Sequence, residues 1–338
     1  MLVNAYCTLR QPPPPDFPHT LIGRRDRSHP DLATHLDGFV GYVLNTRSGE
    51  MTATLYHVTR HLQRVQTQFS LEVEASELGV AFIWARRANA LCFWPDGTVR
   101  DPAGRALVYP DGSPPDVGAE IPYPADALER KARSEAQLAR LEVRVPASLP
   151  PVLGEGEATW RNQAEAEGRA QALMAVALIA ETRGEGDPLP VNRLAERLPA
   201  YATFLSPQER AFLAEDASPP EQVAKFSWRY EALGLLQWAL GLSADLPVPG
   251  AICDVPAVAR TAFEQAAARR PGRLRPAPEL LDALDLTFRL HWAVRDAGLK
   301  GRDAPAGLLP GVVFERHHAL NWLSRFEDHD WDEVDTPT

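Results

Sequence analysis

The segment GVVFERHHALNWLSRFED, residues 311–328, predicts a buried helix with four titratable side chains at its centre. Its valine, leucine, phenylalanine and tryptophan residues are typical of a helix that lies inside a protein. Glu315, Arg316, His317 and His318 interrupt this apolar sequence. Because a buried charge without a partner is very unfavourable, we expect other segments to bring matching charges to this helix.

Two other segments of the C-terminal half combine apolar surfaces with charges in the same way. Residues 225–242 are apolar in every direction around a helix axis, which is typical of a buried helix, and they include Arg229 and Glu231. Residues 280–297 interleave apolar residues with Asp285, Arg289, His291 and Arg295. Asp285 and Arg289 are four residues apart with the acid first, which is the favourable order for an ion pair on one helix.

These three segments predict one interior network of ionisable side chains. In one interpretation the network only fixes how the helices pack, since buried ion pairs can specify a structure without adding much stability. In a second interpretation it is a ligand site, because arginine binds a carboxylate or phosphate through two hydrogen bonds. The expected members are Arg229, Arg289, Arg295, Arg316, Glu231, Asp285, Glu315, His291, His317 and His318.

The ligand-site interpretation gives roles to particular residues. The candidates for general acid or base are Glu315, His318, His317 and Glu231. The residues expected to contact an anionic ligand are Arg229, Arg289, Arg295, Arg316, Asp285, His291, Asn321, Trp228, Trp292 and Trp322. The sequence has no nucleophile elbow and no P-loop, and no glycine-rich dinucleotide motif follows a strand, so we expect no cofactor.

A metal site is a third and weaker alternative. Glu315 and His318 have the Glu-x-x-His spacing that places both side chains on one helix face, as in di-iron bundles. A di-iron site needs a second such motif and two more glutamates, and no second Glu-x-x-His occurs. His57 and His61 are spaced like zinc ligands but lack the glutamate of that motif, so a solvated helix face explains them better.

Composition excludes several classes of function. The chain has 338 residues, which favours two domains, and its net charge is −10. Such a surface repels nucleic acid and anionic membranes, so we expect neither as a partner. No apolar run approaches the roughly 18 residues of a membrane span, and the N-terminus lacks the features of a signal peptide.

The three cysteines fit a reducing, cytosolic environment. Cys7, Cys92 and Cys253 are far apart and form no CxxC pair, which argues against a disulfide framework or a zinc finger. Cys253 has two interpretations, a nucleophile near the histidines or a small apolar residue packed in the interior. The second is favoured, because free cysteine is among the most buried residue types.

The pattern along the chain predicts an α+β module followed by a mainly helical domain. The expected divisions are an α+β module at 1–112, a connector with a polar helix at 113–154, and an all-helical domain with an acidic tail at 155–338. In the module, residue spacing predicts helices at 31–45, 52–66 and 77–89 and strands at 2–9 and 69–75. Thr52 is an expected N-cap, and Asp96-Gly97 predicts a hairpin turn.

The helical domain contains recognisable helix starts. Spacing predicts helices at 125–142, 158–183, 225–242, near 255–269, 278–298 and 311–328. Ser206 and Glu209 form a capping box with proline at the first helical position, and Ser218 and Glu221 repeat that pattern. The tail HDWDEVDTPT, residues 329–338, is an acidic docking segment or a solvated or strapped-down terminus, and the latter is favoured.

Long strings of this sequence resemble a bacterial domain family of unknown function, the one numbered four-two-seven-two. The resemblance covers about residues 150–338, and the family implies no activity. Three N-terminal strings, HLDGFVGYVLN, MTATLYHVTRHLQRVQ and ANALCFWPDGTVRDP, resemble the module that often precedes that domain. The C-terminal strings are KFSWRYEALGLLQWALGL, CDV, LDLTFRLHWAVRDA, GVVFERHHALNWL and WDEVDTPT.

The leading expectation is a cytosolic protein that acts by binding, in a regulatory or immunity-type role. Its acidity would steer it onto a basic protein partner. The alternative is an enzyme for a small anionic substrate, with a glutamate or histidine as acid or base and arginines as clamps. An enzyme requires the ionisable groups to line an open cleft, whereas a binding protein tolerates a sealed network.

Overall fold

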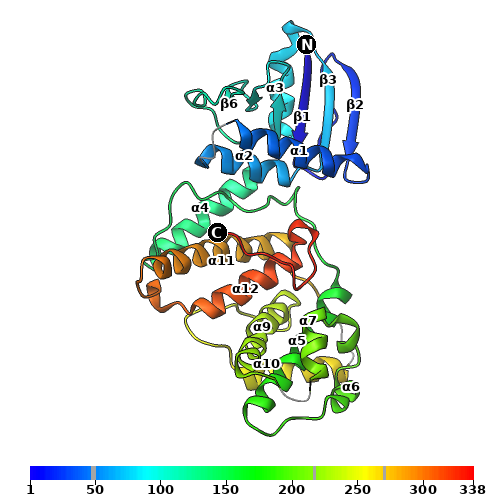
Figure 1. Cartoon of the computed structure of the whole chain (residues 1–338), viewed down its shortest axis with the longest axis vertical. Coiled ribbons are helices and arrows are strands. Elements are labelled where there is room, and N and C mark those ends of the chain that lie inside the picture. The colour runs from blue at the N-terminus through cyan, green and yellow to red at the C-terminus, as the bar shows by residue number, and fades with distance from the viewer. Residues whose placement is uncertain (47–50, 216–217, 269–271) are drawn as a thin grey trace. The chain divides into compact units, whose positions relative to one another are not determined.

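The computed structural model describes residues 1–46, 51–215, 218–268 and 272–338. The chain forms two compact units, one from Met1–Glu129 with Leu153–Ala158 and one from Arg130–Val152 with Thr159–Thr338. The first unit holds an antiparallel sheet with helices and the second is mainly helical (Figure 1). This confirms the predicted α+β class with a helical C-terminal region.

The sheet of the first unit has the strand order β2-β3-β1-β4-β5-β6, and its neighbours are antiparallel. The predicted hairpin at Asp96-Gly97 is confirmed, since it joins β4 to β5 with Gly97 at φ 82°. Edge strand β2 was not predicted, because its mostly exposed residues lack the alternation of a half-buried strand. The strands are β1 Leu2–Cys7, β2 Thr20–Asp26, β3 Thr67–Glu72, β4 Ala90–Phe93, β5 Val99–Arg100 and β6 Ala106–Val108.

Helices pack on both faces of this sheet because successive strand residues point to opposite sides. Ala5 of β1 belongs to the core cluster under α3, whereas its neighbour Tyr6 belongs to the cluster under α1 and α2. The predicted N-cap of α2 is confirmed, since the Thr52 side chain accepts a hydrogen bond from the Leu55 N–H at 3.2 Å. The helices are α1 Asp31–Asn45, α2 Ala53–Gln63 and α3 Leu78–Arg87.

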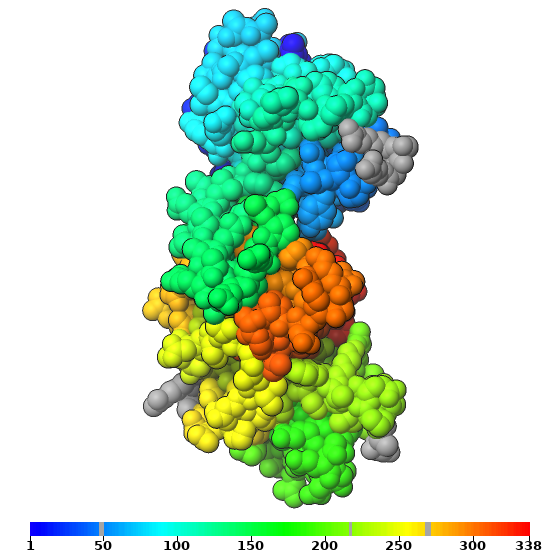
Figure 2. All heavy atoms as spheres, turned by 90° about the vertical axis from the view of Figure 1, so that its left-hand side faces the viewer, coloured from blue at the N-terminus to red at the C-terminus, as the bar shows by residue number. Residues whose placement is uncertain are grey.

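The second unit is built around α5, which packs against α8, α9 and α10. Helix α4 begins in the first unit and continues into the second. Figure 2 shows connector atoms, in green, against the orange atoms of α11 and α12, where Leu138 and Val143 share a core cluster with Leu290 and Val313. The helices are α4 Ala125–Arg140, α5 Gln163–Gly184, α6 Leu194–Arg197, α7 Pro207–Ala214, α8 Pro220–Ser227, α9 Arg229–Ala239, α10 Val255–Ala268, α11 Ala277–Leu299 and α12 Pro310–Leu323.

Some predicted helix limits were wrong, for local reasons. The helix expected at 225–242 breaks at Trp228 into α8 and α9, and the one expected at 311–328 ends at Leu323. The helix expected from 158 begins at Gln163, because the Asn162 and Glu165 side chains form a capping box there. Residue 269, the expected end of α10, lies outside the described residues.

Of the two predicted capping boxes, one is confirmed and one is wrong. Ser206 and Glu209 cap α7 reciprocally, with Pro207 at the first position. At α8 the N-cap residue is Pro219, which has no side chain able to cap, so the helix starts without a side-chain hydrogen bond. Ser218 instead accepts a hydrogen bond from Arg183 at 3.0 Å.

No helix among the described residues is long and apolar enough to cross a membrane.

Candidate functional site

The centre of the helical unit is a buried ion pair between α9 and α12. Nη1 of Arg229 donates to both carboxylate oxygens of Glu315, at 2.8 and 2.9 Å. The two residues are 7% and 4% exposed. Burial raises the pKa of the Glu315 carboxyl above its usual range, and Arg229 opposes that rise without cancelling it. The sequence predicted these two residues as members of one network, and the structure brings them together.

A second buried ion pair lies beside the first and was missed in the sequence. Arg169 of α5 pairs with Glu209 of α7, and its Nη1 also donates to the Phe204 carbonyl at 2.6 Å. Arg169 is 2% exposed and Glu209 is fully buried. One arginine in the alanine-rich, apolar stretch of α5 was the available signal, because a charge there needs a partner. Glu209 was interpreted only as a capping residue, and it serves both roles.

The indole of Trp331, from the segment that follows α12, packs between these ion pairs. The Arg169 guanidinium carbon lies 4.0 Å from the indole centroid, and that of Arg229 lies 5.7 Å from it. The His318 ring is 4.6 Å away and the Trp322 ring 5.5 Å away, both nearly edge-on. Trp331 is 3% exposed, so this part of the tail is packed into the helical unit.

Glu231, Cys253 and Arg316 form a neighbouring group. Oε1 of Glu231 accepts the Cys253 backbone N–H at 2.6 Å. Burial, and then the Glu231 carboxylate, raise the pKa of the Cys253 thiol to about 12. Such a thiol is the opposite of an activated nucleophile, because only the thiolate attacks. Arg316 donates to the Pro247 carbonyl at 2.5 Å, and burial lowers its pKa.

Two histidines meet at the interface of α11 and α12. The Nδ1 atoms of His291 and His317 are 2.8 Å apart, so one ring donates its proton to the other. Burial lowers the pKa of His291 to about 4 and that of His317 well below its usual range. Burial also lowers the pKa of His318 to about 3. These rings are therefore neutral at physiological pH.

Asp285 and Arg289 form a separate pair at the connector. Nε and Nη2 of Arg289 donate to the two Asp285 oxygens at 2.9 and 3.0 Å, and both residues are fully buried. Asp285 also accepts the Val152 N–H at 3.2 Å, and Arg289 donates to the Pro150 carbonyl at 3.0 Å. This pair fastens α11 to the connector, so the expected single network is divided into several groups.

The remaining predicted residues lie around these groups. Asn321 donates to the Asp335 carbonyl at 2.8 Å, and Trp292 packs partly buried against the connector cluster. Trp228 is 38% exposed and its ring lies over Gly311. Arg295 is exposed and donates to Thr338 at 3.1 Å, because near the end of α11 its long side chain reaches the surface.

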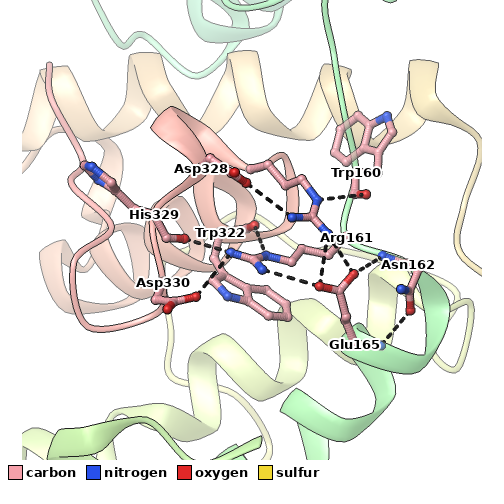
Figure 3. A network of polar contacts seen from close by, with 9 residues as sticks. Trp160, Arg161, Asn162, Glu165, Trp322, Asp328, His329 and Asp330 are labelled. Atoms are coloured by element: carbon pink, nitrogen blue, oxygen red, sulfur yellow. Dashed lines mark hydrogen bonds and ion pairs between the residues drawn. The ribbon is translucent and has the colours of Figure 1, made fainter. Parts of the chain in front are cut away.

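A further polar network holds the base of the tail (Figure 3). Two guanidiniums converge on Glu165, from Arg161 at 3.4 Å and from Arg325 at 3.0 and 3.1 Å. Nη2 of Arg161 also donates to the His329 carbonyl at 2.8 Å, and its Nε to the Trp322 carbonyl at 3.4 Å. Segments far apart in the sequence are thereby fastened together at the start of α5.

Most of the candidate acid and base groups are bonded within the helical unit. Glu315 is bound by Arg229 and Oε1 of Glu231 accepts a backbone N–H, whereas Oε2 of Glu231 is buried without a hydrogen-bond partner among the described residues. The candidate histidines are buried. Of the weak metal candidates, Glu315 accepts from Arg229 through both oxygens and the His318 ring packs against Trp331. Within the described ranges, no three metal-ligating side chains gather at one point.

Comparison with known proteins assigns the helical unit to a family. A search of curated proteins and a search of solved structures each found no significant match. The family model described as "Domain of unknown function (DUF4272)" matches residues 130–334. That match spans most of the chain and includes the ion pairs, the histidine pair and Trp331, whereas Asp335 and Thr338 lie beyond it. The chain therefore belongs to the DUF4272 family, a domain family of unknown function.

Proposed function

We propose that this chain is a cytosolic bacterial binding protein, regulatory or immunity-type, whose acidic surface receives a basic protein partner. The observation that supports the proposal is that the candidate acids, histidines and arginines of the helical unit, except the exposed Arg295, are used internally. Glu315 is 4% exposed and bound by Arg229, and Asp285 is fully buried and bound by Arg289. A reaction at these groups would first require the helices to separate.

The distribution of charge between the interior and the surface supports the same proposal. Among the described residues, the buried cations are Arg130, Arg161, Arg169, Arg229, Arg289 and Arg316, and the buried acids are Asp101, Glu157, Glu209, Glu231, Asp285 and Glu315. The positive charges of the first set equal the negative charges of the second, so the net charge of −10 comes from the rest of the chain. An excess of surface acids accelerates encounter with basic proteins and repels acidic ones.

The test is capture of partners from the native host followed by kinetics with the purified partner. We expect a basic protein whose association rate falls steeply as salt rises, because steering is screened over about 8–10 Å at physiological ionic strength. The dissociation rate should change much less. A captured partner that is acidic, or an association rate indifferent to salt, would contradict the proposal.

A second candidate function is an enzyme or receptor for a small anionic compound. It is favoured by two buried guanidinium nitrogens, Nε of Arg169 and Nε of Arg229, which have no hydrogen-bond partner among the residues that the structure describes. Inorganic phosphate and small dicarboxylates are the probes. A saturable rise in the melting temperature of the wild type, lost in Arg229→Lys, would favour this function, because lysine cannot reproduce the planar fork of arginine.

A further inference from the structure

The segment 329–338, here called the strap, docks on the helical unit through three buried side chains. Trp331, Val334 and Thr336 are buried, whereas Asp330, Glu333 and Asp335 are exposed. The indole enters a seat formed by Arg169 of α5 with His318 and Trp322 of α12. The strap begins with a turn, in which the N–H groups of Glu333 and Val334 donate to the Asp330 carbonyl at 2.9 and 3.1 Å, and Trp331 anchors this turn in the seat.

The helical unit forms its hydrogen bonds with groups that any copy of the strap would present, and these include the His329 carbonyl, which accepts from Nη2 of Arg161 at 2.8 Å. The Asp332 carboxylate accepts the Gln208 N–H at the start of α7, at 2.9 Å. The Asp335 carbonyl accepts from Asn321 at 2.8 Å, and the Thr338 hydroxyl from Arg295 at 3.1 Å. A strap supplied by another molecule would make the same contacts without loss.

The hinge that folds the strap back onto its own unit has unfavourable backbone geometry. After α12 ends, Arg325, Glu327 and Asp328 adopt φ of 51°, 52° and 56°. L residues disfavour this left-handed region, and such geometry persists only where neighbouring contacts enforce it. Here the contacts include those of Arg325 with Glu165, with the Trp160 carbonyl at 3.4 Å and with Asp328 at 3.2 Å.

A monomer with its own strap and a dimer with exchanged straps have the same seat contacts. They differ in the cost of association, in the strain of two hinges, and in the partly exposed Arg325–Glu165 latch. Strained hinges are a recognised route to exchange, because only the opened hinge can relax.

We propose that two copies of this chain exchange their straps, so that Trp331 of one copy occupies the seat of the other. The partner is a second copy of the chain, since its strap is the one ligand whose complete fit to the seat is on view. The interface contributes a residue to each seat, and the latch determines how often the strap opens.

The experiment measures the dimer dissociation constant of full-length variants by light scattering over a wide range of concentration. Glu327→Gly relaxes the hinge in the monomer, and Glu327→Ala is its matched control, because alanine removes the carboxylate but keeps a side chain at positive φ. We expect Glu327→Gly to dimerise at least about tenfold more weakly than Glu327→Ala, because two hinges are relieved in each dimer. Equal dimerisation of these two variants would overturn the proposal.

Two further variants separate strap exchange from dimerisation through another surface. Arg325→Ala removes the latch while leaving an L residue at the strained position, so it should dimerise more strongly than the wild type. Trp331→Phe keeps an aromatic anchor and folds more readily than a deletion. It weakens the seat equally in the monomer and in the exchanged dimer, so it should leave the dimer dissociation constant unchanged and accelerate the exchange of labelled subunits between dimers. A wild type and an Arg325→Ala variant that are both monomeric at every concentration would sink the idea, as would a rate of subunit exchange that Trp331→Phe does not change.

Discussion

At the scale of single residues, each buried guanidinium of the helical unit is bound to a carboxylate or to a backbone carbonyl oxygen. Arg229 pairs with Glu315, Arg169 pairs with Glu209 and donates to the Phe204 carbonyl, and Arg316 donates to the Pro247 carbonyl. Burying a charge is unfavourable, and the attraction within a pair recovers that cost only when the geometry is good. Replacing one member of a buried ion pair should therefore lower the free energy of unfolding more than replacing both members with apolar residues.

Glu315→Ala tests this directly. Removing the carboxylate leaves Arg229 buried and uncompensated, so we expect the free energy of unfolding to fall by about 3–5 kcal/mol. The double variant Arg229→Met, Glu315→Leu replaces the pair with apolar side chains of similar size, so its free energy of unfolding should fall much less. Urea unfolding of the wild type and the two variants is the measurement, and a Glu315→Ala unfolding free energy close to that of the wild type would contradict burial of the pair.

The paired histidines predict loss of stability in mild acid. The pKa of His291 is about 4 in the folded protein, below the ordinary value of 6.5, so the unfolded chain binds more protons between those values. Stability should fall as pH drops from about 6.5 toward 4, by up to about 1.4 kcal/mol per pH unit for each such histidine. Urea unfolding at pH 7, 6 and 5 measures this slope. His291→Phe should make it shallower, and an unchanged slope in that variant would assign the effect elsewhere.

At the scale of elements, caps and close approaches decide where helices begin and meet. The sequence around Ser206 at α7 repeats around Ser218 at α8, but only Ser206 caps its helix. The pattern shows which side chain could cap, but the proline at the N-cap position of α8 prevents it. The break at Trp228 escaped prediction for a related reason, since an apolar surface in all directions carries no signal of where a helix is interrupted.

Ser206→Ala and Ser218→Ala form a matched pair for this difference. Ser206 accepts the Glu209 N–H and its helix start is buried, so we expect Ser206→Ala to lower the free energy of unfolding by about 1 kcal/mol. Ser218 caps no helix, and its replacement should cost less than half as much. Equal losses in chemical denaturation would mean that the cap of α7 contributes nothing beyond an ordinary serine contact.

The approach of α9 to α12 depends on Gly311. A Cβ there would lie 2.8–3.0 Å from atoms of the Trp228 ring, whereas a Cβ at Gly298 of α11 would meet nothing within 4 Å. We expect Gly311→Ala to push the indole outward and shift tryptophan fluorescence to the red. Gly298→Ala should leave the spectrum unchanged and stabilise the helix by up to about 1 kcal/mol. A red shift from Gly298→Ala, or none from Gly311→Ala, would contradict this packing.

At the scale of the whole molecule, sequence patterns predicted the class of fold and most helices, because hydrophobic spacing is a local property. They also predicted which charges are buried in α9 and α12, but in α11 they were wrong for Arg295, which is exposed. They did not predict that these charges divide into separate groups, because pairing depends on which helices become neighbours. Arg169, Glu209 and Trp331 were missed for the same reason, since each takes its role from a partner distant in sequence.

The first unit shows the same dependence on distant sequence, because the chain returns to it at Leu153–Ala158 after entering the helical unit. Glu157 is 4% exposed there, and it contacts Arg64 at 3.5 Å and Asn89 at 3.5 Å. Glu157→Ala should therefore lower the stability of the sheet by about 1–3 kcal/mol, seen as faster hydrogen exchange of amides in β1 and β4. Glu155→Ala, at an exposed position of the same segment, should change stability by less than about 0.5 kcal/mol. If both variants exchange like the wild type, the returning segment does not stabilise the sheet.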